Sequence, residues 1–357
     1  MTRFVVLDQL RLNPNLVGTN SSGAPCGMRD SGVESSQQTN GCISIQYHKG
    51  PISSMMTPAK THIWPELPWK EWEDTAATLH MWTQIVGKTR LALTPLLNHW
   101  WNVPLYVSAR GLTTSAMPYG EEMLEIEFDF VSHELTFRLS SGTVHAVPLR
   151  PQSVASFYAE FQDCLEAIRV SVKIHPVPVE ISDPIPFGKD EQHHSYDREY
   201  AHRFWQSLSS ADHIFRQFSS RFIGKMSPVH FFWGSFDLAV SRFSGRRAPE
   251  RAGADLITRE AYSHEVISAG FWPGNGGFGM PAFYCYTAPA PAGLELEKVK
   301  PETAYYDKTL GEFILKYDDM RAAASAEAAL MEFLQSTYEA GANLAKWNRA
   351  SLERQSS

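Results

Sequence analysis

The sequence predicts an α+β fold in which antiparallel β-meanders are covered by helices. Residues 123–131 alternate between apolar and acidic side chains, a pattern typical of a strand with one buried face. Residues 200–222 carry large apolar side chains three or four positions apart, which is typical of an amphipathic helix. The order helix, strands, helix occurs in both halves of the chain. These observations favour two α+β units.

The first half begins with a helix from Trp72, whose apolar residues recur at helical spacing until Val86. Pro95 ends or bends this helix. We then expect strands at 105–112, 123–131, 135–139 and 143–147. A second helix opens after Pro151 and Ser153, and its apolar face is formed by Val154, Phe157, Phe161, Leu165 and Ile168. A short strand near 170–174 completes this half.

A proline-rich linker at 177–196 separates the halves, because its prolines exclude a regular helix. The second half is predicted to contain a helix at 200–222 and strands at 229–243, 264–272 and 282–287. A short apolar run follows at 312–317, and the last helix spans about 325–348. The expected units are therefore 59–176 and 197–350.

The two halves also share a His-aromatic-aromatic segment, at 99–101 and at 230–232. With the shared order of elements, this predicts an internal duplication with a pseudo-twofold relation. The alternative is chance similarity between two units of the same fold class. Residues 1–58 differ from both halves, because they are polar and aperiodic. We expect them to be a disordered or foreign extension, with Met56 as an alternative start.

Composition excludes several classes of function. Net charge is −7 and the basic residues are scattered, so no nucleic-acid partner is expected. No apolar run approaches the roughly 20 residues that span a bilayer, so no membrane partner is expected. The four cysteines form no CxxC pair, and no secretory leader precedes the domain. A cytoplasmic location fits best, while cofactor and oligomeric state stay open.

The segment 227–247 is the most informative part of the sequence. As one strand, it places His230, Phe232, Phe236, Leu238, Val240 and Arg242 on one face, and Trp233, Ser235, Asp237 and Ser241 on the other. A buried strand whose second face is small, polar and acidic is typical of a cavity wall. We therefore predict a small-molecule site beside strand 229–243.

Several long segments carry a resemblance to a known family. They include WPELPWKEW at 64–72, SPVHFFWGSFDLAVSRFSGR at 227–246 and REAYSHEVISAGFWPGN at 259–275. Over about residues 62–352 the chain resembles the bacterial domain-of-unknown-function family 5996. The resemblance implies no activity, cofactor or site residue. It does imply that the first 58 residues lie outside the family's fold.

Two kinds of chemistry are open to the candidate residues. A metal site needs several histidines and a carboxylate to converge, and His230, His264, Glu265 and His99 are the candidates, but no HxH or HExxH spacing is present. Acid–base chemistry would use Asp237 with His230 or His264. A buried Asp237 needs a partner, for which Arg242, Arg246 and Arg110 are available. The alternative is a structural ion pair.

Nucleophile and phosphate-binding motifs are missing. The chain has no GxSxG or SxxK segment, and the Gly-rich run at 274–280 lies between two prolines, so it opens no helix. Three hypotheses remain. The first is an enzyme that uses Asp237 and a histidine. The second is a binding module in which Trp233, Trp272 and Tyr262 hold an apolar or planar ligand, with Ser235, Arg242 and Arg110 as polar partners. The third is an interaction protein with an aromatic partner surface.

Overall fold

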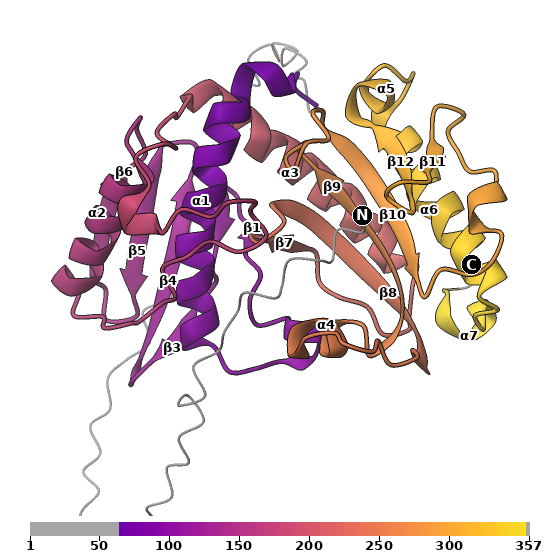
Figure 1. Cartoon of the computed structure of the whole chain (residues 1–357), viewed down its shortest axis with the longest axis horizontal. Helices are drawn as coiled ribbons and strands as arrows, with labels where there is room; N and C mark the ends of the chain where they lie inside the picture. Colours follow the sequence, from indigo (N-terminus) through magenta and orange to yellow (C-terminus); the bar gives the residue numbers. More distant parts are fainter. Residues whose placement is uncertain (1–63, 355–357) are drawn as a thin grey trace, which may run out of the picture. The chain divides into compact units, whose positions relative to one another are not determined.

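The computed structural model describes residues 64–354, which contain two six-stranded antiparallel sheets and the helices that cover them (Figure 1). The predicted α+β class is confirmed. The predicted extension, residues 1–58, lies outside the described residues. Residues 64–354 belong to one compact unit. None of the helices in this part is long and apolar enough to cross a membrane.

The first sheet has the strand order β1-β2-β4-β5-β6, with β3 paired to β4. Its strands are β1 (Tyr106–Val107), β2 (Gly111–Thr113), β3 (Met117–Tyr119), β4 (Glu122–Asp129), β5 (Glu134–Leu139) and β6 (Val144–Pro148). The predicted strand 105–112 is two short strands, because a turn closed by Ser108 N donating to Gly111 O (2.9 Å) reverses the chain. The apolar side of β4 packs into the core as predicted.

Two helices cover the buried side of this sheet. Helix α1 (Trp69–Leu93) is buried on nearly all sides from Thr75 to Arg90, so it lies inside the molecule. Helix α2 (Val154–Ala167) begins at Ser153, whose side chain accepts the amide hydrogen of Ser156. The ring of Trp82 in α1 stacks on Phe157 in α2 with 4.4 Å between centroids.

The second sheet has the order β11-β12-β10-β9-β8-β7. Its strands are β7 (His230–Phe232), β8 (Asp237–Arg247), β9 (His264–Trp272), β10 (Ala282–Ala288), β11 (Tyr305–Asp307) and β12 (Glu312–Lys316). Helices α3 (Arg198–Ser220) and α6 (Ala326–Leu344) pack against one face of it. The remaining helices are α4 (Leu256–Ala261), α5 (Tyr317–Arg321) and α7 (Arg349–Leu352), with 3-10 turns η3 (Asn98–Trp100), η4 (Phe187–Lys189) and η5 (Leu294–Leu296).

The two sheets meet edge to edge at β1 and β7 (Figure 1). Leu105 and Phe231 exchange both backbone hydrogen bonds, at 2.9 and 2.8 Å. The neighbouring strands β1, β2, β4, β5 and β6 follow chain order, as do β7, β8, β9, β10 and β12. A duplication requires this similarity in strand order, and it also requires that the two halves superpose. The duplication therefore stays a prediction.

Residues 170–174 form no strand, in contrast to the sequence prediction. Val170 and Ile174 are buried in the core, and this burial accounts for the apolar alternation that suggested a strand. The linker contains a single 3-10 turn, η4, and is held against α1. There the side chain of Gln84 donates to Val179 O and accepts from Val179 N, both at 2.8 Å.

Candidate functional site

The predicted strand 229–243 is a hairpin. β7 ends at Phe232, residues 233–236 form a turn, and β8 begins at Asp237. Phe236 takes a positive φ of 60° to close this turn. The single-strand prediction was wrong because apolar side chains continue through the turn and hide it. Phe232 pairs with Asp237 and His230 with Ala239, so these four side chains share one face of the sheet.

The two faces of β8 have different surroundings. Leu238 and Val240 belong to the core beneath the helices, and Arg242 is also buried on this side. Asp237, Ala239 and Ser241 point to the opposite face, where a cavity of about 200 Å³ lies. Its wall includes parts of β8, β9 and β10, the segment 99–103, residues 179–180 and α4. The aromatic residues that line it are Trp100, Trp101, Phe232, Trp233, Phe243, Tyr262, Tyr284 and Tyr286.

Asp237 is the most buried acidic group of this cavity wall, with 4% of its surface exposed. Its carboxylate accepts a hydrogen bond at each oxygen, from the hydroxyl of Ser235 and from the phenol of Tyr284. The prediction that an arginine pairs with Asp237 was wrong. Arg110 pairs with Asp129, Arg246 with Glu265, and Arg242 donates to Phe218 O. Within residues 64–354, no cationic side chain forms an ion pair with Asp237.

Hydroxyl groups supply most of the other polar surface. Tyr284 and Tyr286 lie two residues apart on β10, and their rings stack with 6.2 Å between centroids. The phenol oxygens of Tyr262 and Tyr286 are 2.9 Å apart, and the Ser241 hydroxyl donates to Ser268 at 2.9 Å. Burial raises the pKa of Tyr286 to about 12 and that of Tyr262 well above its usual value. Both phenols are therefore neutral at pH 7.

His99 also lines the cavity. Its Nε2 lies 2.7 Å from the Lys225 ammonium, which is a donor only, so Nε2 accepts. The other ring nitrogen therefore donates to Ala261 O, at 3.1 Å. Burial is the main cause that lowers the pKa of His99, and Lys225 lowers it further. The imidazole is neutral, and it joins the segment 98–101 to α4.

Side chains of α1 hold the inner wall in place. His80 Nε2 lies 2.8 Å from Gly234 O in the hairpin turn, and the Trp233 indole donates to Val103 O at 2.8 Å. Gly87 lies directly beneath that indole, since a Cβ added to Gly87 would be 2.3 Å from the ring. Burial lowers the pKa of His80 to about 4, so this imidazole is neutral too.

Four of the predicted site residues line the cavity together, namely Trp233, Ser235, Asp237 and Tyr262. Trp272 is a neighbour: its indole donates to Asn275 Oδ1 at 2.6 Å, and Asn275 donates to Ser235 O at 3.0 Å. Trp272 therefore positions Ser235 through Asn275.

Two predicted histidines lie outside the cavity lining. His230 is fully buried and is surrounded by the rings of Trp101, Tyr106 and Phe232. His264 packs against His99 with 5.7 Å between ring centroids. Neither is joined to Asp237 by a hydrogen bond in the part of the chain that the structure describes.

The remaining predicted residues have other partners. Glu265 forms an ion pair with Arg246. The Arg242 guanidinium is buried on the helix side of the sheet, where it lies 3.3 Å from the ring centre of Phe218 and 4.4 Å from that of Tyr338. Burial lowers the pKa of Arg242 to about 10, so it stays charged. Arg242 thus stabilises the packing of α3 and α6 rather than the cavity.

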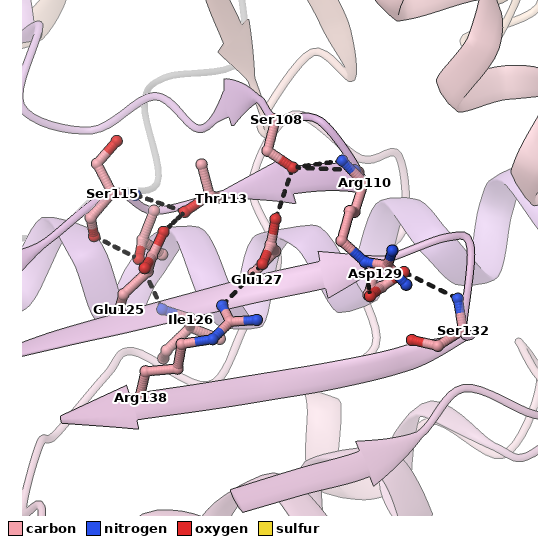
Figure 2. A network of polar contacts seen from close by, with 12 residues as sticks. Ser108, Arg110, Thr113, Ser115, Glu125, Ile126, Glu127, Asp129, Ser132 and Arg138 are labelled. Atoms are coloured by element: carbon pink, nitrogen blue, oxygen red, sulfur yellow. Dashed lines mark hydrogen bonds and ion pairs between the residues drawn. The ribbon is translucent and has the colours of Figure 1, made fainter. Parts of the chain in front are cut away.

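Arg110 belongs to a polar network on the first sheet (Figure 2). There Arg138 pairs with Glu127 at 2.7 Å across β4 and β5, and Ser108 donates to the same carboxylate at 2.6 Å. Glu127 and Asp129 are largely buried in this network.

Four further residues line the cavity and were not predicted from the sequence, namely Tyr284, Tyr286, Ser268 and Glu180. The signal available was the alternation in AFYCYTA at 282–288, which places both tyrosines on one face of β10. This alternation does not reveal that β10 pairs with β9. That pairing brings Tyr284 beside Gly270 and within reach of Asp237.

Across residues 64–354, no group of three or more His, Cys, Asp or Glu side chains is arranged to hold a metal ion. No curated protein and no solved structure matches the chain. A model described as a family of unknown function (DUF5996) matches residues 64–354, which is the whole described part. The chain therefore belongs to the DUF5996 family.

Proposed function

We propose that this protein is a binding module for a small molecule with an apolar or planar body. The observation that supports it is the cavity beside Asp237. Eight aromatic side chains line it, and a few polar groups converge on it, as is typical of ligand sites. An apolar cavity of about 150 Å³ holds benzene, so this cavity of about 200 Å³ has room for one ring and a short side chain.

Backbone strain beside the cavity supports the same proposal. His99 and Trp100 both have positive φ values, 57° and 60°, and so does Phe236, which precedes Asp237. Such conformations cost of order 1–3 kcal/mol each and cluster at functional sites. Here they direct the segment 99–101 and the hairpin turn toward the cavity.

The two other hypotheses have less support. An acid–base enzyme would need a histidine beside Asp237, whereas His230 and His264 have other surroundings. An aromatic partner surface would need exposed rings. Among the large apolar side chains exposed in the described part, Tyr305 is the only aromatic one.

The test is a screen of small aromatic compounds by thermal shift, with Ala239→Leu as the blocking variant. Ala239 lines the cavity, so a leucine there fills space without removing a polar contact. A ligand at 100 times its Kd stabilises a protein by about 2.7 kcal/mol. We expect hits on the native chain, none on Ala239→Leu, and retained hits on Ala328→Leu, an exposed control in α6. Hits that persist in Ala239→Leu would contradict the proposal.

A further inference from the structure

The charge of the cavity lining points to the class of ligand. Two carboxylates, Glu180 and Asp237, line the cavity, whereas none of its described lining residues is a lysine or an arginine. The imidazole there, His99, is kept neutral by burial and by Lys225. The phenols of Tyr262 and Tyr286 are neutral as well, because burial raises the pKa of each. The lining side chains that ordinarily carry a charge at pH 7 are therefore both carboxylates.

Asp237 keeps hydrogen-bonding capacity. A carboxylate can accept about four hydrogen bonds, two at each oxygen. Here one hydroxyl donates to each oxygen of Asp237, so two acceptor positions remain. Hydroxyl donors stabilise the anion but bring no opposite charge. A buried charge is normally paired, because its removal from water is costly. A ligand with a positive group would supply the missing charge and further donors.

The aromatic rings around the cavity suit a cation in a second way. The face of an aromatic ring attracts cations within about 6 Å of its centre. Cationic groups of this chain already occupy such faces at the cavity margin. Lys225 lies 5.5 Å from Trp101 and 5.3 Å from Phe243, and the guanidinium of Arg251 lies 4.1 Å from Tyr262.

We propose that the ligand is an organic amine, bound as its ammonium ion with the charge at Asp237 and the apolar body against the aromatic wall. This inference rests on the proposed function and adds the charge of the ligand to it. The size of the cavity limits the amine to about one ring with a short aminoalkyl chain.

The experiment compares three probes that share a phenylethyl body by calorimetry at pH 7: 2-phenylethylamine, 2-phenylethanol and 3-phenylpropionate. We expect the amine to bind at least tenfold more tightly than the alcohol, and the carboxylate to give no measurable binding. Asp237→Asn should remove the preference for the amine and leave the affinity for the alcohol within about threefold. Asp318→Asn, which changes an exposed ion pair, is the matched control and should leave all three affinities unchanged.

The outcomes separate the two proposals. Equal binding of amine and alcohol in the native chain, abolished by Ala239→Leu, would overturn the amine inference and leave the binding function intact. Stronger binding of the carboxylate would overturn it as well. If none of the probes binds, both proposals fail for ligands of this size. Should Asp237→Asn not fold, the ranking of the three probes on the native chain decides alone.

Discussion

Gly87 tests whether the inner wall of the cavity is packed as described. It lies inside helix α1, where replacing glycine by alanine usually stabilises a protein by about 0.5–1 kcal/mol. In this chain a Cβ on Gly87 would lie 2.3 Å from Cγ and Cδ1 of Trp233, well inside van der Waals contact. The indole is rigid and is fixed by its hydrogen bond to Val103 O.

We therefore expect Gly87→Ala to lower the free energy of unfolding. Overpacking costs about 1–3 kcal/mol, and loss of the indole hydrogen bond costs about 1 kcal/mol more. After the gain in helix propensity, a net loss of about 1–3 kcal/mol remains. Urea unfolding followed by circular dichroism measures it.

Two controls isolate the contact. A Cβ on Gly188 would meet only Tyr158, at 3.7 Å, so Gly188→Ala should change stability by less than about 1 kcal/mol. In a Trp233→Ala background, Gly87→Ala should turn stabilising, because the clash is gone. Stabilisation by Gly87→Ala in the native background would refute the packing of Trp233 on α1.

The remaining predictions concern the polar groups near the cavity. Tyr284→Phe should lower the free energy of unfolding by about 1.5–3 kcal/mol, because the phenol donates to a carboxylate. Tyr286→Phe removes a contact between neutral phenols and should lower it by only about 0.5–1.5 kcal/mol. Equal losses in urea unfolding would contradict this. The folded pKa of His80 is about 4 and that of His230 about 3, both lowered mainly by burial from 6.5. Between pH 6.5 and the lowered folded pKa, the unfolded chain binds more protons than the folded chain. The free energy of unfolding should therefore fall as pH drops from 6.5 to 4, by about 3 kcal/mol for His80. Neither ring nitrogen of His230 has a hydrogen-bond partner. His230→Leu should therefore keep the free energy of unfolding at pH 7 and make it less dependent on pH. A loss above about 2 kcal/mol at pH 7 would count against this prediction.

Periodicity predicted the regular elements well. The spacing of apolar residues placed a helix at 200–222, and the structure has α3 at Arg198–Ser220. Strand 264–272 is reproduced as β9 without a shift. The helix was recognisable because α3 buries one continuous face, which the spacing of its apolar residues records. The strand was recognisable as a short apolar run, because β9 is buried on both faces from Val266 to Trp272. The family resemblance over 62–352 is confirmed by the match to 64–354.

The site was less accessible to sequence reasoning, because its contacts are long-range. The turn at 233–236 contains a single glycine and places Phe236 at positive φ, so no turn motif marked it. The partner of Asp237 is Tyr284, 47 positions away on a strand that is not adjacent to β8. Reach across the intervening strand is possible because Gly270 leaves room for the Tyr284 ring. Strand order and that glycine together decide the contact.

The most direct test of the cavity as a ligand site is a crystal structure determined with 2-phenylethylamine. The account predicts density for the ring against the aromatic wall, with the amine nitrogen about 2.7–3.2 Å from an Asp237 carboxylate oxygen. The hydroxyls of Ser235 and Tyr284 should keep their contacts to that carboxylate. A cavity that stays empty at saturating amine, or amine bound only away from Asp237, would contradict it.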